Sequence, residues 1–203
     1  MFFSKLTKSF SMKKLGFLLA AFVLLCASQA SAQVYSSRAT AQLTLDGKTE
    51  VYNYKSEAIT FYLNMDSRTL NFYCKPYTFV MNEPTSEASR LLVGALAMNN
   101  DNGGVMEFRG NLPATFKMPK ASKSVKTMVS GQMLVAGVEK SFVLPLSVYA
   151  DAKGQQFSYS LNATFDLNNL GIELPAEVKE KTKGLVHLSF TDVALKQKNR
   201  SQK

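Results

Sequence analysis

The side chains that could do chemistry are few in this sequence. His187 is the single histidine, and it alternates with Ser189 on the polar face of an apolar–polar segment. A lone histidine in that setting is usually an exposed strand residue. Cys74 alternates with Leu70 and Phe72 on an apolar face, which is typical of a small buried hydrophobic residue. Neither side chain has a recognisable catalytic partner in the sequence.

The motifs of the common enzyme classes are also missing. The sequence contains no G-x-S-x-G elbow, P-loop, glycine-rich dinucleotide fingerprint or EF-hand loop. Zinc needs three or four His, Cys or acidic ligands at suitable spacing, which one histidine and one cysteine do not supply. The 15 acidic residues leave a two-carboxylate hydrolase as a distant alternative, because no pair stands out. We therefore predict a protein that is not an enzyme and that uses no cofactor and no metal.

The first 32 residues have the composition of a secretory signal peptide. Four lysines and no acid precede an apolar run at residues 15–27, and small residues follow at Ala30 and Ala32. A basic start, a short apolar run and an A-x-A cleavage site are typical of an exported protein. The run is shorter than the ~20 residues of a membrane-spanning helix. A start at Met1 and a start at Met12 both retain these features, so we predict export and cleavage after residue 32.

Removal of this segment leaves 20 basic and 15 acidic residues, a net charge of +5 against +9 for the full chain. Cys74 is then the last cysteine, so an apolar core rather than a disulfide within the chain must stabilise the fold. A net charge of +5 without interleaved aromatic and basic residues argues against nucleic-acid binding. We predict a single domain over residues 33–195 and a flexible basic tail at 196–203.

Most of this domain alternates apolar and polar residues with a period of two, the pattern of half-buried β-strands. Turns are predicted at Asp46-Gly47 and at residues 137–140. A short helix is expected at 85–98, and a second begins at Pro175 and ends at Gly184. Strands recurring every ~8–12 residues indicate an antiparallel sandwich or barrel. Closure into a barrel is favoured because it removes exposed edges.

Three segments fit the alternation less well. Pro76 interrupts one strand, after which residues 77–81 are predicted to resume a strand in a shifted register. Residues 114–118 form a further candidate strand. Residues 99–104 are rich in Asn and Gly and are predicted to form a loop.

The apolar faces of the predicted strands are rich in Phe and Leu and would line a barrel interior. The candidate lining residues are Phe61, Leu63, Leu70, Phe72, Phe142, Leu144, Phe157, Tyr159, Leu161, Phe165, Val186, Leu188 and Phe190. Each of them is an ordinary core residue if the barrel is filled. A barrel of about eight strands can be packed shut or can hold one small ligand, so the pattern leaves both arrangements open.

A series of lysines recurs at every third residue, with no acid between Glu107 and Glu139. The members are Lys117, Lys120, Lys123 and Lys126. Charge runs of this kind are usually solvated surface. The alternative is an electropositive rim that attracts an anionic headgroup, a phosphate or a membrane surface.

Two stretches of the C-terminal third, SGQMLVAGVEKSFVLPLSV at residues 130–148 and FDLNNLGIELP at residues 165–175, resemble those of the YceI-like family of exported bacterial proteins. The first stretch is similar to a family motif at Gly131, Leu134, Gly137, Val138, Leu144 and Pro145. The family motif reads G-x-L-T-hydrophobic-x-G-V-x-x-x-hydrophobic-x-L-P. The family's F-x-hydrophobic-x-R-x-x-[FY]-G-hydrophobic stretch is similar at Phe165, Leu167, Leu170, Gly171 and Ile172. The resemblance covers residues 130–195. The family's H-S-x-hydrophobic-x-F and R-D-x-H-L segments are absent from the N-terminal half.

This resemblance implies a lipocalin-like antiparallel β-barrel of about eight strands whose apolar interior holds a polyisoprenoid chain. It implies a non-catalytic binding protein in the bacterial periplasm or outside the cell. The partners would be an apolar lipid and, peripherally, a membrane, with no nucleic acid. The alternative is an envelope interaction protein with a solid barrel and a surface partner site. That alternative predicts an exposed apolar patch on the order of several hundred Å².

Overall fold

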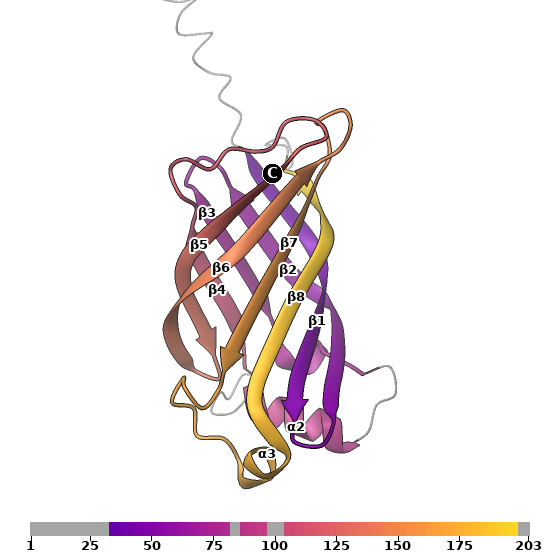
Figure 1. The fold of residues 1–203 in the computed structure, drawn as a ribbon, viewed down its shortest axis with the longest axis vertical. Coiled ribbons are helices and arrows are strands. Elements are labelled where there is room, and N and C mark those ends of the chain that lie inside the picture. Colours follow the sequence, from indigo (N-terminus) through magenta and orange to yellow (C-terminus); the bar gives the residue numbers. More distant parts are fainter. Residues whose placement is uncertain (1–32, 82–85, 97–103, 199–203) are drawn as a thin grey trace, which may run out of the picture. The chain divides into compact units, whose positions relative to one another are not determined.

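The alternating segments close into a barrel of eight antiparallel strands (Figure 1). The computed structural model describes residues 33–81, 86–96 and 104–198. The strands are β1 (Val34–Gly47), β2 (Val51–Asn64), β3 (Thr69–Cys74), β4 (Met106–Asn111), β5 (Ser124–Val135), β6 (Val138–Ala150), β7 (Phe157–Asp166) and β8 (Thr182–Gln197). Each strand pairs with its neighbours along the chain, and β8 pairs with β1. This confirms the prediction of an all-β, lipocalin-like barrel of about eight strands.

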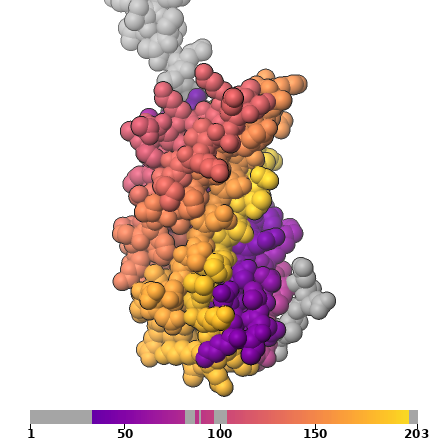
Figure 2. All heavy atoms as spheres, in the orientation of Figure 1, coloured from indigo at the N-terminus to yellow at the C-terminus, as the bar shows by residue number. Residues whose placement is uncertain are grey.

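The period of two explains which side chains enter the barrel. On β1, Ala39, Ala41, Leu43 and Leu45 are buried, while the residues between them are exposed or half-buried. The same alternation on the other strands gives one continuous apolar core inside the barrel. Side chains of β1 and β5–β8 form a continuous wall on the face shown in Figure 2. Closure of the wall pairs every strand on both sides, which removes exposed edges.

Two helices lie together at one end of the barrel, opposite the end at which β8 finishes (Figure 1). The helix α2 (Ser86–Leu96) connects β3 to β4, and α3 (Ala176–Lys181) connects β7 to β8. The phenol of Tyr54 on β2 donates a hydrogen bond of 2.8 Å to the carbonyl of Ala88 in α2. Both predicted helices are therefore confirmed, and they cover what we call the helix end of the barrel.

The hairpin between β1 and β2 has a longer turn than predicted. Asp46 pairs with Val51, so the turn comprises residues 47–50 rather than Asp46-Gly47 alone. Neither Asp46 nor Gly47 has a positive φ, so the expected two-residue turn geometry is not used. The N–H of Lys48 instead donates 2.9 Å to the carbonyl of Lys181, which ties this turn to the end of α3.

The hairpin between β5 and β6 has a tighter turn than predicted. Val135 pairs with Val138, so the chain turns through Ala136 and Gly137 rather than through residues 137–140. Both turn residues have positive φ, 48° and 81° respectively. This is the geometry of a type I′ turn, whose twist matches that of the two strands.

Two predicted strands are wrong. The chain forms a single turn of 3-10 helix, η2 (Pro76–Thr78), where a strand was expected at 77–81. Proline has no N–H to give to a strand ladder but fits the first turn of a helix. Only Val80 returns to the sheet, through an isolated bridge to Lys55. Residues 114–118 belong to the loop between β4 and β5, where Phe116 is buried.

The helix after Pro175 ends at Lys181 rather than at Gly184, because β8 begins at Thr182. Gly184 lies inside β8 with a φ of 77°. A Cβ at this position would lie 2.4 Å from Nδ2 of Asn168. That amide crosses over Gly184 to donate 3.0 Å to the carbonyl of Lys183, so glycine is needed for both the backbone angle and the close approach.

The last strand also runs beyond the predicted domain end. Lys196 on β8 pairs with Ser36 on β1. The N–H of Lys198 donates 2.8 Å to the carbonyl of Val34. The prediction of a flexible tail at 196–203 is therefore corrected, since pairing with β1 orders the chain through Lys198.

Three sequence predictions concern residues outside the described part of the chain. They are the signal peptide at 1–32, the loop at 99–104 as far as residue 103, and the tail at 199–203. Among the described helices, none is long and apolar enough to cross a membrane.

Candidate ligand-binding interior

The predicted lining residues lie on the inward faces of the strands. Eleven of the thirteen are buried. The other two, Phe142 and Phe157, are half-buried and pack against the core near opposite ends of the barrel. Their burial confirms the predicted faces. That these residues contact a ligand stays a prediction.

Aromatic rings from five strands meet inside the barrel. The rings of Phe61 on β2 and Tyr159 on β7 stack with centroids 3.8 Å apart and planes 17° apart. Since β1 and β8 separate these strands along the wall, the stack spans the interior. Phe72 adds contacts of 5.7 Å to Phe108 and 5.2 Å to Phe190. Protein side chains therefore fill the barrel at this level.

The helix end is closed by apolar packing. Leu91, Leu92 and Leu96 of α2 are buried, with exposures of 0–1%. Ion pairs join α2 to α3, between Glu87 and Lys181 and between Arg90 and Glu177. The Lys181 ammonium lowers the pKa of the Glu87 carboxyl, first through their hydrogen bond and then through their charges. The two helices thus form one cover over this end.

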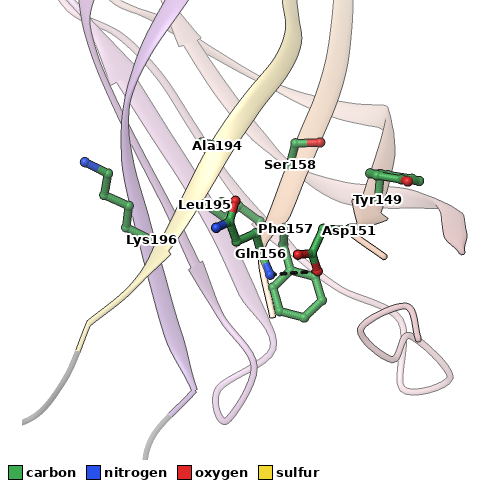
Figure 3. Close-up of a pocket in the computed structure, with 8 residues that line it drawn as sticks. All are labelled: Tyr149, Asp151, Gln156, Phe157, Ser158, Ala194, Leu195 and Lys196. Atoms are coloured by element: carbon green, nitrogen blue, oxygen red, sulfur yellow. Dashed lines mark hydrogen bonds between the residues drawn. The ribbon is translucent and has the colours of Figure 1, made fainter. Parts of the chain in front are cut away.

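The opposite end, which we call the rim end, carries an open pocket of about 480 Å³. Its lining comes from the ends of β6, β7 and β8 and from the turn between β6 and β7 (Figure 3). The lining residues are Tyr149, Asp151, Gln156, Phe157, Ser158, Ala194, Leu195 and Lys196. Phe157 and Leu195 pair across β7 and β8 and belong to the inward faces, so the rim pocket borders the barrel core.

Asp151 in the rim pocket has a structural role. Its carboxylate accepts hydrogen bonds from the N–H groups of Gln155 and Gln156, at 2.7 and 3.1 Å. The bond from Gln156 is drawn in Figure 3. These backbone donors, Gln156 first, lower the pKa of the Asp151 carboxyl. The acid therefore holds the β6–β7 turn as an ionised carboxylate, which is unsuited to donating a proton.

The four lysines of the predicted electropositive series are exposed, at positions 117, 120, 123 and 126. They lie at the rim end, because the carbonyl of Lys123 accepts a 3.0 Å hydrogen bond from the N–H of Ala150, next to Asp151. None of them takes part in an ion pair within the described residues. Their role towards an anionic headgroup stays a prediction.

His187 and Cys74 occupy the places expected of them. His187 is on the outer face, where its Nδ1 lies 3.0 Å from the Thr164 hydroxyl and its Nε2 lies 3.7 Å from an Asp46 oxygen. Cys74 is fully buried, and burial raises the pKa of its thiol. In the part of the chain that the structure describes, no three His, Cys, Asp or Glu side chains cluster as metal ligands would.

Several inward residues are absent from the predicted lining set, and one of them, Ser37, is polar. Ser37 on β1 is 7% exposed and continues the inward row that Ala39 begins. Its polarity hides it from a search for apolar faces. Strict alternation back from Ala39 places Ser37 and Tyr35 on the same face, so the period of two is the signal that identifies it.

The fold of this chain is similar to that of solved structures, whereas its sequence matches no family model. No curated protein matches the chain in sequence either. The fold is similar to that of a polyisoprenoid-binding domain from Saccharophagus degradans implicated in plant cell wall breakdown, with a TM-score of 0.62 and 9% identity. That match covers 82% of this chain and 98% of the domain.

A second similar structure is BcnA from Burkholderia cenocepacia, with a TM-score of 0.52 and 10% identity. That match covers 77% of this chain and 96% of BcnA. The protein is thus a closed antiparallel barrel with an apolar interior. Its fold is YceI-like, as the resemblance of its C-terminal third predicted, at a low level of sequence identity.

Proposed function

We propose that this chain is an exported, non-catalytic bacterial protein that binds an apolar, isoprenoid-type lipid in the barrel interior. The observation that carries the proposal is the apolar core of a closed eight-stranded barrel that matches 98% of a domain described as polyisoprenoid-binding. The proposed location is the periplasm or the extracellular space, supported by the basic, then apolar, then small-residue order of residues 1–32.

Binding requires the ring stack inside the barrel to open. Phe61 and Tyr159 would have to part from their 3.8 Å contact to admit a chain. An aromatic pair contributes about 0.5–1.5 kcal/mol beyond its buried area. Each buried methylene group of a ligand contributes ~0.8 kcal/mol. The contribution of the pair beyond its buried area therefore equals that of about one or two buried methylene groups of a ligand.

The exposed lysines supply the proposed membrane contact. Lys117, Lys120, Lys123 and Lys126 would place the rim end against an anionic surface, where each contributes about 1 kcal/mol. The test is co-sedimentation with vesicles of neutral lipid and with vesicles containing an anionic lipid. We expect salt-sensitive binding to anionic vesicles only, lost when all four lysines become Gln. Equal sedimentation of the Gln variant would contradict the membrane role and leave interior binding intact.

The test of interior binding is native mass spectrometry of the full chain after purification without detergent. We expect one lipid per protein, released on organic extraction and replaced by added geranylgeraniol. Asn162→Trp adds a bulky ring to the exposed outer face of β7 and should leave binding unchanged. Ala163→Leu adds volume to the buried inner face of the same strand and should weaken it. Lipid-free protein that takes up no isoprenoid would overturn the proposal.

A second candidate is an envelope interaction protein with a solid barrel. The specific observation in its favour is that the Phe61–Tyr159 stack fills the interior in the conformation described. Two exposed aromatic residues, Tyr73 and Tyr77, also line a surface pocket of about 340 Å³ on the outer wall. This candidate predicts that Ala163→Leu lowers stability without affecting any lipid. It also predicts that Tyr73→Ser and Tyr77→Ser abolish capture of a protein partner by the otherwise intact barrel.

A further inference from the structure

The apolar interior contains two hydroxyl groups without partners. Ser37 is 7% exposed and Tyr159 is 1% exposed. Within the described residues, Ser37 Oγ and Tyr159 Oη are buried side-chain oxygens that make no hydrogen bond. A buried polar group without a partner destabilises the fold, because its hydrogen bonds with water are lost and not replaced. Such groups call for an explanation, such as an ordered water or an ion, and the polar group of a bound ligand would supply the same missing partner.

The two hydroxyls belong to one layer of the barrel. Ser37 on β1 pairs with Phe61 on β2, and the Phe61 ring stacks on the Tyr159 ring. Burial raises the pKa of the Tyr159 phenol, and the neighbouring Ser37 hydroxyl lowers it by less, although the two oxygens do not meet the geometry of a hydrogen bond. Two O–H donors from different strands therefore face the same part of the interior, next to the stack that has to open.

This layer lies directly below the rim. Tyr35 precedes Ser37 and Phe157 precedes Tyr159 by two residues on the same inward faces. The rings of Tyr35 and Phe157 meet edge to face at 5.7 Å, and Phe157 lines the rim pocket. One aromatic layer thus separates the two hydroxyls from an open pocket.

Strand pairing is irregular in the wall beside the hydroxyl layer. The register of β1 with β8 shifts between Ser36 and Gln42. The register of β7 with β8 shifts between Tyr159 and Leu161. Opposite that shift, Asp192 has a φ of 48° and donates its N–H to the Ser160 hydroxyl at 3.1 Å. Regular ladders therefore do not continue through this part of the wall.

We propose that Ser37 and Tyr159 bind the polar end of the interior ligand, and that this end is an uncharged oxygen acceptor, a hydroxyl or carbonyl, on an apolar chain. The inference rests on the proposed function and adds the ligand's chemical class and orientation. Two O–H donors match one oxygen acceptor. A phosphate end would place a charge in the apolar core, where burial without a paired cation is costly. The rim lysines are exposed and lie on the outside of the barrel.

The test compares geranylgeraniol with the hydrocarbon in which a methyl group replaces its alcohol carbon, by competition in native mass spectrometry of the full chain. We expect wild-type protein to prefer the alcohol by about tenfold. Tyr159→Phe and Ser37→Ala should each reduce this preference to roughly threefold or less. Tyr35→Phe is the matched control, one layer nearer the rim, and should retain the full preference. The aldehyde of the same chain should behave like the alcohol.

Stability distinguishes ligand binding from a structural role. Without ligand, Tyr159→Phe removes an unpartnered hydroxyl, so the urea midpoint should stay equal or rise while the alcohol preference falls. A lower midpoint with an unchanged preference would assign Tyr159 to the fold and overturn the inference. If Tyr35→Phe instead lost the preference for the alcohol, the polar end of the ligand would lie at the rim, and the inference would also be overturned. Equal binding of alcohol and hydrocarbon would contradict the anchor but keep the proposed function, whereas no binding of either would contradict both.

Discussion

Each end of the barrel contains a buried tyrosine, and the two tyrosine hydroxyls differ in their hydrogen bonding. At the helix end, Tyr54 is 3% exposed and its hydroxyl donates 2.8 Å to the carbonyl of Ala88. Towards the rim end, Tyr159 is 1% exposed and its hydroxyl has no partner among the described residues. A satisfied hydroxyl stabilises the fold, and an unsatisfied one stabilises it only when something else fills the site. Under the proposed function, this difference gives one end a role in stability and the other a role in ligand binding.

The surroundings of the two tyrosines repeat this contrast. The helix end is sealed by leucines of α2 and by ion pairs between α2 and α3. The rim end has an open pocket bordered by the half-buried Phe157. The register of β1 with β8 also shifts at the helix end, between Leu45 and Gly47, so the open pocket is the feature that distinguishes the rim. Packing at native density resists change, while a partly exposed aromatic layer can move. We therefore expect ligand access at the rim and little movement at the helix end.

The largest expected effect comes from a cavity at the helix end. Leu91→Ala should lower the free energy of unfolding by about 2–5 kcal/mol, because Leu91 is fully buried between α2 and the barrel. Urea denaturation followed by circular dichroism measures this. Val93→Ala on the same helix is the control, since Val93 is 43% exposed and should change stability by less than about 0.5 kcal/mol. A loss below about 1 kcal/mol for Leu91→Ala would show that α2 does not seal the barrel.

A cavity made at the rim end should lower the stability less than one at the helix end. Phe157→Ala should lower stability by about 1–2 kcal/mol, less than the roughly 3–5 kcal/mol of a buried phenylalanine, because Phe157 is only half-buried. It also removes the ring that separates the rim pocket from the hydroxyl layer. Uptake of geranylgeraniol should therefore be faster, as stopped-flow mixing or time-resolved mass spectrometry would record. An effect on stability as large as that of Leu91→Ala would erase the proposed difference between the ends.

Removal of the two tyrosine hydroxyls should change the stability less than the two cavities do. Tyr54→Phe should destabilise the ligand-free protein by about 1 kcal/mol, because it removes the hydrogen bond that joins β2 to α2. The same substitution at Tyr159 should leave stability equal or improved. Paired urea titrations of the two variants test the sign. If both variants lose the same stability, the Tyr159 hydroxyl has a partner in the ligand-free protein and the contrast fails.

The sequence predicts the stabilising part of this contrast better than the binding part. The period of two placed all thirteen candidate lining residues on inward faces, eleven of them buried, because burial of apolar side chains is what the alternation encodes. It could not predict that Phe61 and Tyr159 meet across the barrel, since that contact joins strands that are not neighbours. Turns were less predictable, as the hairpins at residues 47–50 and at Ala136-Gly137 depend on strand register.

Ser37 shows the same limit at the level of one residue. Serine is a normal residue at an exposed strand position, and only its place in the alternation indicates that it points inward. Whether its hydroxyl has a partner depends on the strands across the barrel, and the local sequence pattern contains no information about them. The candidate polar anchor is therefore visible only when the strands have been assembled.

The smallest expected effect concerns the ion pair between α2 and α3, and it depends on pH. The Lys181 ammonium lowers the pKa of Glu87, whose ordinary value is 4.5. A carboxyl whose pKa is lower in the folded state contributes stability above its unfolded pKa and loses it as pH falls through the folded value. Glu87→Gln should therefore be less stable than wild type at pH 7, with the difference shrinking below about pH 4.5 and vanishing in more acidic solution.

Urea midpoints across this pH range measure the difference between wild type and Glu87→Gln. Lys181→Gln should remove most of the pH dependence of that difference, because Lys181 lowers the Glu87 pKa more than Arg90 does. Exposed pairs contribute little and are screened by salt, so the effect should also fall as salt is added. A difference that persists unchanged in acid would mean that the Glu87 carboxylate does not hold α2 to α3. The cover of the helix end would then depend on its apolar packing alone, which is the part of the contrast that Leu91→Ala probes.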